Sequence, residues 1–157
     1  MGQFLGTHLN RLDTKGRVSI PSTFRAGLRA GSDTGECAVV LRPSHTHSCI
    51  EAWPIEVFSA LTAPVERLDL FSEEQDDLTT ALYADAHRLE ADKEGRVLLP
   101  EMLVAHAGLT DAVSFMGKGR TFQIWEPAAA ARRMAEARDR ARGVTLQGAR
   151  LLPETKQ

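Results

Sequence analysis

Short apolar runs bounded by turn residues recur along the chain and predict a protein made mainly of β-strands. Four runs have the length of a strand and are rich in apolar side chains: residues 18–20, 38–41, 97–99 and 113–116. In residues 121–125, Phe122 and Ile124 alternate with polar neighbours, which is typical of a strand with one buried face. Because Gly117-Lys118-Gly119 separates this run from the one before it, we expect the two to form a β-hairpin.

Other segments carry helical signals and should lie at the periphery. Four of them are residues 22–28, 54–61, 101–107 and 128–142. The last is rich in alanine and arginine, and Gly143 stops it. Its arginines, from Arg132 to Arg142, could contact DNA, a neighbouring copy or only solvent, and solvent is the ordinary state of such a face.

A further helix should begin at Ser72, because Ser72 and Gln75 have the spacing of a capping box. Three apolar residues then share one helical face: Leu78, Leu82 and Ala86. We expect this helix and the one over 54–61 either to cover the strands or to bridge to neighbouring molecules.

The chain contains an internal duplication. Residues 13–21 (Asp-Thr-Lys-Gly-Arg-Val-Ser-Ile-Pro) recur as residues 92–100 (Asp-Lys-Glu-Gly-Arg-Val-Leu-Leu-Pro), with five of nine positions identical. After each proline come a helical stretch, an apolar strand, a turn, and a strand that ends at Trp53 or Trp125. A shared order of elements over so many residues indicates two copies of one module.

The duplication predicts the domain organisation. We expect a first module over 7–54, a helical connector over 55–82, a second module over 83–127, a C-terminal helix over 128–143 and a mobile tail over 144–157. In the first module the polar connection over 42–48 should be an exposed loop.

Charge is distributed unevenly although its total is small. The net charge is −2, whereas most nucleic-acid-binding domains are basic overall. Residues 1–30 nevertheless carry five cations against one aspartate, and residues 54–77 carry seven carboxylates against one arginine. The field at a binding face depends on local charge, so a basic face remains compatible with this composition.

The repeated Asp-x-x-Gly-Arg motif has the chemistry of a tight turn that presents an arginine. The aspartates, Asp13 and Asp92, can accept from the backbone two residues on, and the glycines, Gly16 and Gly95, can take positive φ without strain. The planar guanidinium groups that follow can hold a phosphate or the edge of a guanine through two bonds. On spacing alone, Arg17 and Arg96 could equally serve to close the turns by pairing with Asp13 and Asp92.

The opening Gly-Thr-His-Leu-Asn-Arg-Leu-Asp-Thr-Lys-Gly-Arg of residues 6–17, the second Asp-x-x-Gly-Arg and the two tryptophans together resemble the MraZ family. The resemblance implies two SpoVT/AbrB-like swapped-hairpin modules in one chain, which together form an interleaved β-barrel with peripheral helices. It also implies ring oligomers that bind short G-rich direct repeats in double-stranded promoter DNA and repress the division and cell-wall gene cluster, including their own gene.

The same resemblance implies DNA contacts from particular residues. These are Arg17 and Arg96, with Lys15 as a phosphate contact in the first copy. Glu94 stands at the position of that lysine in the second copy, so the first turn should contribute more to DNA binding than the second.

Rival functions have weaker support. The main alternative is a protein-interaction module: an antitoxin of the AbrB-like fold, or a structural ring without specific DNA binding whose acidic helices bind a partner. Antitoxins of this fold usually carry one copy of the barrel and a toxin-binding tail, whereas this chain carries two copies and a short tail. No nucleotide-binding, esterase or metalloprotease motif occurs in the sequence, so we expect no enzyme, no cofactor and no small-molecule substrate.

Two remaining questions concern metals and compartment. His45, His47 and Cys49 could supply metal ligands, but a fourth ligand is lacking, and a polar loop with solvated histidines is the simpler interpretation. With no membrane-spanning run and no export signal, we expect a cytoplasmic protein associated with the nucleoid. In that compartment Cys37 and Cys49 should be buried thiols and not a disulfide.

Overall fold

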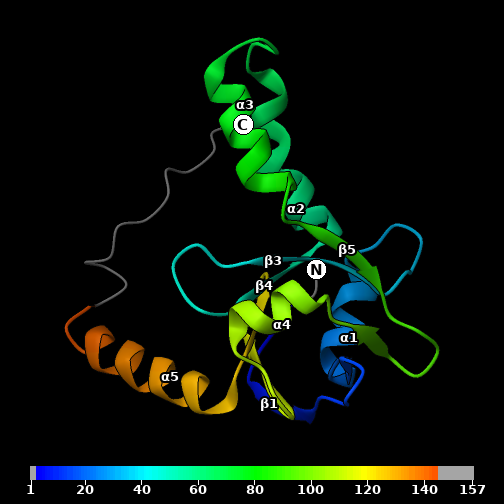
Figure 1. Ribbon diagram of the computed structural model, residues 1–157, viewed down its shortest axis with the longest axis vertical. Helices are drawn as coiled ribbons and strands as arrows, with labels where there is room; N and C mark the ends of the chain where they lie inside the picture. The colour runs from blue at the N-terminus through cyan, green and yellow to red at the C-terminus, as the bar shows by residue number, and fades with distance from the viewer. Residues whose placement is uncertain (1–2, 145–157) are drawn as a thin grey trace.

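The structure is a computed structural model that describes residues 3–144. Each copy contributes four strands and one short helix in the same order (Figure 1). The first copy consists of β1 (Thr7–Arg11), β2 (Arg17–Ser19), α1 (Ser22–Ala30), β3 (Ala38–Pro43) and β4 (Ile50–Pro54). The second consists of β5 (His87–Glu90), β6 (Arg96–Leu98), α4 (Glu101–Ala107), β7 (Ala112–Gly117) and β8 (Phe122–Trp125). The predicted order of elements is therefore confirmed.

Strands of the two copies interleave. One antiparallel sheet has the order β1-β7-β8-β4-β3-β5, and β2 pairs with β6 in a separate two-stranded ribbon. Strands β1 to β4 of the first copy correspond to β5 to β8 of the second. When each strand is replaced by its counterpart, the sheet has the same strand order in reverse. The edge strand of each copy thus pairs with the other copy, as β1 does with β7 and β5 with β3. The fold is a mainly β, duplicated AbrB-like fold with swapped strands, as predicted.

The core lies between this sheet, the ribbon and helices α1 and α4. Four phenylalanines, each 1% exposed or less, meet there: Phe4, Phe24, Phe115 and Phe122. The ring centroids of Phe24 and Phe122 lie 4.9 Å apart, and Phe4 meets Phe24 edge to face at 5.3 Å. Because these rings come from both copies and from the N-terminal segment, neither module has a core of its own, and burial of this shared surface favours the interleaved arrangement.

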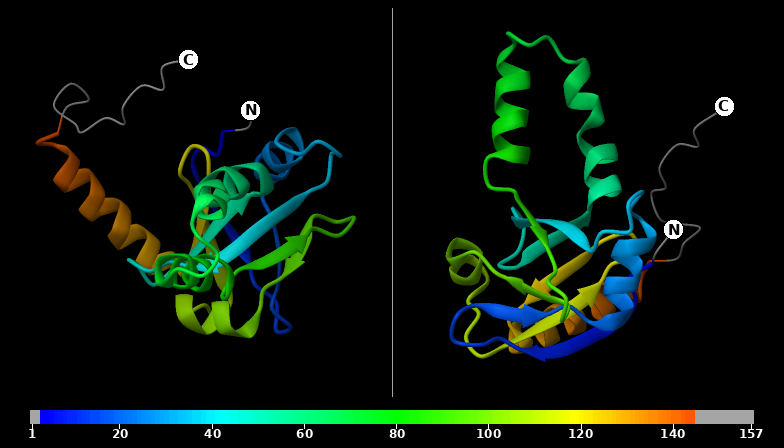
Figure 2. Two further views of the ribbon diagram at one scale, coloured as in Figure 1. Left: turned by 90° about the horizontal axis from the view of Figure 1, so that it is seen from above. Right: turned by 90° about the vertical axis from the view of Figure 1, so that its right-hand side faces the viewer.

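Helices between the copies stand away from the sheet. α2 (Ile55–Thr62), the 3-10 helix η1 (Ala63–Arg67) and α3 (Glu73–Tyr83) form a helical hairpin that projects from the strands (Figures 1 and 2). Ser72 caps α3 by accepting from the backbone N–H of Gln75 at 3.1 Å, as the capping box predicts. No residue of α3 is buried. Of the two roles predicted for these helices, α3 therefore does not cover the strands, whereas α2 packs on the sheet through buried Phe58, whose ring lies 6.4 Å from that of Trp53 in β4.

The C-terminal helix α5 (Pro127–Ala141) touches the sheet only through its first turns. Four buried residues form a small second core at that contact: Cys49, Met116, Trp125 and Ala130. Beyond it the helix leaves the body of the molecule (Figure 2). Within residues 3–144 no helix combines the length and apolarity needed to cross a membrane.

Two sequence predictions need correction. The connection predicted as exposed over 42–48 begins inside β3, where Arg42 is buried and its Nη2 lies 3.0 Å from Nε2 of His45. An arginine in a polar run thus lies in the interior because its charge finds partners there, including Glu51 at 3.6 Å. The helix predicted to carry Ala86 ends at Tyr83. The predicted mobile tail lies outside the described residues, except for Val144.

Candidate nucleic-acid interface

The first Asp-x-x-Gly-Arg motif forms a tight turn between β1 and β2. Oδ1 of Asp13 accepts from the backbone N–H of Lys15 at 2.9 Å and of Arg17 at 2.8 Å. The N–H of Gly16 donates to the carbonyl of Asp13 at 3.1 Å, and Gly16 has a φ of +89°. Both predicted devices, the aspartate acceptor and the left-handed glycine, are therefore present.

The second motif repeats this geometry between β5 and β6. Oδ1 of Asp92 accepts from the N–H groups of Glu94 and Arg96, each at 2.9 Å. Gly95 has a φ of +79°. Each turn also binds the other copy, because Ile20 donates to the carbonyl of Gly95 at 2.9 Å and Leu99 donates to that of Gly16 at 2.8 Å. Neither turn is therefore complete without the partner module.

Pairing of β2 with β6 places both motif arginines on one face. In this antiparallel register Arg17 lies opposite Leu98, and Ser19 lies opposite Arg96. Side chains alternate along a strand, so these four residues share the outer face while Val18 and Val97 point inward and are buried. Arg17 and Arg96 are thus diagonal neighbours, a relationship with a typical spacing of about 7–8 Å.

The two arginines line one open hollow of about 520 Å³. A third cation, Arg11 at the end of β1, lines the same hollow and is exposed. Two carboxylates, those of Asp13 and Asp111, also face it. From the sequence, Arg11 is only one of the five cations of residues 1–30. Its position six residues before Arg17 does not indicate that the turn brings the two side chains together.

Each motif arginine pairs with the aspartate of its own turn through Nε. The Nε–Oδ2 distance is 2.9 Å for Arg17 and Asp13, and 3.3 Å for Arg96 and Asp92. This is the turn-closing role that spacing alone allowed. It occupies one edge of each guanidinium and leaves the Nη1 and Nη2 atoms for other partners, so closing the turn and binding a ligand are compatible.

The Nη atoms of the two arginines differ in their surroundings. Among the described residues, Nη1 and Nη2 of Arg17 have no hydrogen-bond or ion-pair partner. Nη2 of Arg96 instead forms an ion pair with the carboxylate of Glu94. The lysine that corresponds to Glu94, Lys15, is exposed. The second turn therefore presents a partly neutralised arginine, whereas the first presents two cations.

Hydrogen bonding also affects the aspartates. The pKa of the Asp13 carboxyl lies below its ordinary value, chiefly because the backbone N–H of Arg17 donates to it. The pKa of Asp92 is lowered in the same way by the N–H of Arg96. Both carboxylates are therefore charged at neutral pH, and they keep the arginines oriented.

The histidines and cysteines of the first copy do not converge. His45 lies 3.0 Å from an Arg42 nitrogen, the ring of His47 lies 5.7 Å from that of Trp125, and Cys49 is fully buried. Within residues 3–144 no group of three potential ligands is placed to hold a metal ion. Cys37 and Cys49 are both free, buried thiols, which confirms that prediction.

Comparison with known proteins agrees with this geometry. Residues 3–80 and 82–140 match the family described as "MraZ protein, putative antitoxin-like". A protein named Transcriptional regulator MraZ from Gluconacetobacter diazotrophicus is 63% identical over 146 residues, which cover 93% of this chain and 92% of the relative. The chain belongs to the MraZ family.

Other MraZ relatives extend over similar lengths. The protein of that name from Gluconobacter oxydans is 58% identical over 142 residues, 90% of this chain and 87% of the relative. The one from Pelagibacter ubique is 38% identical over 138 residues, 88% of this chain and 87% of the relative. These relatives are named as transcriptional regulators and not as enzymes, in agreement with the expectation that this chain is no enzyme.

Proposed function

We propose that this protein is a DNA-binding transcriptional regulator and that the outer face of the β2–β6 ribbon contacts the DNA. One observation supports the proposal above all others. Arg17 and Arg96, which hold the same position in the two copies, are diagonal neighbours on that face. Each planar guanidinium closes its turn through Nε, and its Nη atoms suit phosphates or guanine edges in the major groove. At Arg96 such a ligand competes with Glu94 for Nη2.

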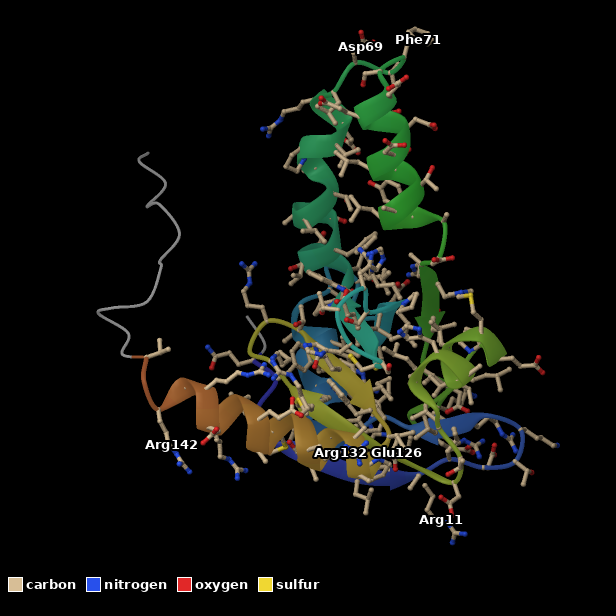
Figure 3. All side chains as sticks on the ribbon, turned by 60° about the vertical axis from the view of Figure 1, so that its left-hand side comes forward. Arg11, Asp69, Phe71, Glu126, Arg132 and Arg142 are labelled. Carbon is tan, nitrogen blue, oxygen red and sulfur yellow. The ribbon has the colours of Figure 1, made fainter. Side chains whose placement is uncertain are left out.

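The distribution of charge supports the same orientation. Arg11 lies at one end of the molecule, and the acidic helical hairpin, with Asp69 near its tip, lies at the other (Figure 3). Like charges repel over about a Debye length, roughly 8 Å at physiological salt. Holding the carboxylates of residues 54–77 far from the ribbon therefore lets a protein of net charge −2 approach a polyanion.

A third cation extends this surface. Arg11 lines the same hollow as Arg17 and Arg96, and Lys15 stands at the tip of the first turn. We assign Arg11 and Lys15 to phosphate contacts, and Arg17 and Arg96 to the positions that read base edges or clamp phosphates.

The resemblance to the MraZ family also suggests an oligomeric state, a DNA sequence and a set of controlled genes. We infer that copies of this chain assemble in a ring, bind short G-rich direct repeats upstream of their own gene and repress the division and cell-wall gene cluster in the cytoplasm, at the nucleoid. Several modules that bind consecutive repeats add their affinities through a high effective concentration, so one hollow with few cations is sufficient.

An electrophoretic shift with the DNA upstream of the protein's own gene tests the proposal. The double variant Arg17→Ala/Arg96→Ala should lose the shift at protein concentrations that saturate it for the wild type. Arg138→Ala/Arg140→Ala on α5 removes the same charge elsewhere and should retain binding. If the turn variant binds as the wild type does, the arginines only close turns, and the alternative of a protein-interaction module, such as an antitoxin or a structural ring, is favoured.

A further inference from the structure

The tip of the helical hairpin presents two large apolar side chains to solvent. Phe71 is 95% exposed and Leu70 is 73% exposed. The tip is nevertheless an ordered turn, because Oδ1 of Asp69 accepts from the N–H of Phe71 at 3.0 Å and its carbonyl accepts from Oγ of Ser72 at 2.8 Å. Figure 3 shows Asp69 and Phe71 together at the outer end of the hairpin, far from the strands.

Exposed apolar residues are concentrated on this hairpin. Half of the exposed large apolar residues of residues 3–144 lie on this one hairpin or its tip: Leu61, Leu70, Phe71, Leu78 and Tyr83. Single exposed apolar residues are ordinary, but two adjacent large apolar side chains at the tip of a projecting element are typical of an interaction site. Acidic residues surround these apolar side chains and would keep a hairpin without a partner soluble. They also favour a partner surface that carries positive charge.

A matching recess lies at the other end of the hairpin. It has a volume of about 310 Å³, and its floor is Phe4, which is 1% exposed. Gly27 of α1 and Val57 of α2 line its walls. A Cβ on Gly27 would lie 2.9 Å from the Phe4 ring, so the absence of a side chain there lets Phe4 pack closely against α1 at the recess. Its size is at the lower end of the range for ligand pockets, roughly 300–1,000 Å³.

The charges of the tip and the recess are complementary. Arg120 lines the recess, and exposed Lys118 belongs to the same β7–β8 turn. Asp69, Glu73 and Glu74 surround Phe71 in sequence. One carboxylate, Glu56, also lines the recess, so the attraction comes from the side of the β7–β8 turn.

We propose that Leu70 and Phe71 of one copy insert into the Phe4 recess of a second copy, with Asp69, Glu73 and Glu74 facing its Arg120. The tip does not reach the recess of its own chain, because the 11 residues of α3 hold it roughly 16 Å from the base of the hairpin. Tip and recess are different surfaces, so the contact is head-to-tail, and each copy offers a free recess to the next. The inference rests on the proposed ring and names its interface.

Self-association measured by light scattering after size exclusion tests this interface. Phe71→Asp should reduce the wild-type oligomer to a monomer of 17.2 kDa. Its thermal midpoint should stay at the value of a wild-type sample diluted to the monomer, because Phe71 makes no buried contact. The control Met102→Asp introduces the same charge at another exposed apolar residue, on α4, and should leave the oligomer intact.

A mixing experiment identifies the two surfaces. Phe71→Asp keeps its recess, whereas Arg120→Glu keeps its tip and should itself be monomeric or strongly weakened in assembly. An equimolar mixture of the two should contain a heterodimer that grows no further. Glu74→Arg combined with Arg120→Glu in one chain should restore at least part of the assembly that Arg120→Glu loses.

The outcomes separate this inference from the proposed function. If the wild type assembles and Phe71→Asp retains the full mass, the tip is not the interface, although the ring stands. If the wild type is a monomer at all concentrations, both the interface and the ring are wrong. Binding to a single-repeat DNA tests the ribbon independently of assembly. Phe71→Asp should bind this DNA with the affinity of the wild-type monomer.

Discussion

Glu94 forms an ion pair with Nη2 of Arg96, and the corresponding position of the first copy carries Lys15. The two halves of one pseudo-symmetric ribbon thus differ in charge at the tips of their turns. A DNA phosphate that approaches Arg96 competes with a carboxylate of the same chain, whereas one that approaches Arg17 meets free Nη atoms.

Glu94→Lys should therefore increase affinity for DNA. The variant adds a cation at the second turn and frees Nη2 of Arg96, so a gain on the order of tenfold is expected for a single repeat, about 1.4 kcal/mol. Fluorescence anisotropy with a short labelled duplex measures it. Glu136→Lys, an equal change of charge on α5, is the control and should have a smaller effect. Equal effects would show that only net charge matters.

Truncation of the two arginines should also be unequal. Arg17→Ala should weaken binding more than Arg96→Ala. Only at Arg96 must a phosphate displace a carboxylate, that of Glu94, from an Nη atom. The difference should shrink in the Glu94→Gln background, where that ion pair is absent. A larger loss for Arg96→Ala in the wild-type background would contradict the assigned asymmetry.

The turn glycines should differ in how well they tolerate alanine. Both have positive φ, so each Gly→Ala change costs about 1–2 kcal/mol of folding free energy. At Gly95 the new Cβ would also lie 1.6 Å from Nη1 of Arg25, which donates to the carbonyl of Glu94. Displacing that side chain loses a hydrogen bond worth a further ~1 kcal/mol.

Urea unfolding compares these glycine variants. Gly95→Ala should be less stable than Gly16→Ala, where the nearest other atom lies 3.4 Å from the new Cβ. In an Arg25→Ala background the difference should disappear. Its persistence there would show that Arg25 is not the cause.

Acid should destabilise the fold through the turn aspartates. The pKa values of Asp13 and Asp92 are lowered in the folded state. Their stabilisation is therefore fully present above the unfolded-state pKa, about 3.9, and is lost as the pH falls through the lower folded-state values. The free energy of unfolding measured in urea should change little with pH through these groups between pH 5 and 7, where their stabilisation is complete, and should fall below about pH 4.

The variant Asp13→Asn/Asp92→Asn isolates this contribution. It should be less stable than the wild type at pH 7 and lose less stability below pH 4. The lowered pKa of Glu126, which caps α5, leaves a residual acid sensitivity in both proteins. If wild type and variant lose the same amount on acidification, the turn aspartates are not responsible.

The cysteines should be unreactive in the folded protein. Burial raises the pKa of the Cys49 thiol to about 11 and also raises that of Cys37. At pH 8 only about one Cys49 in a thousand would be a thiolate, the reactive form. Labelling with iodoacetamide should therefore be slow for the native protein and fast in denaturant. Rapid native labelling would show that these thiols are not buried.

Sequence reasoning predicted the local elements well where a short-range rule applied. Residues 101–107 form a helix after Pro100, residues 113–116 lie in a strand, and Ser72 caps a helix, because proline, glycine and capping residues act within a few positions. The interleaved pairing of strands came instead from the family resemblance. Hydrophobic alternation shows which face of a strand is buried, but not which strand is its neighbour.

Long-range contacts also explain what was missed. Arg42 was predicted to be exposed, and it is buried because Glu51, in the paired strand β4, and His45 receive its guanidinium. The sequence does not connect Arg11 with the hollow that Arg17 and Arg96 line, nor Arg25 with the second turn, although Arg25 donates to the carbonyl of Glu94, 69 residues away. Both contacts depend on the three-dimensional arrangement of the copies, which composition and spacing do not encode.

The dependence of DNA binding on salt shows whether Arg17 and Arg96 contact DNA phosphates. The affinity of the wild type, Arg17→Ala and Arg96→Ala for a single-repeat duplex would be measured between 50 and 200 mM salt, a range over which phosphate contacts have large effects. Each lost phosphate contact lowers the slope of log K against log salt by about 0.9. Both variants should have a lower affinity and a shallower slope than the wild type, with the larger affinity loss for Arg17→Ala. Unchanged affinity and slope in both variants would contradict these contacts.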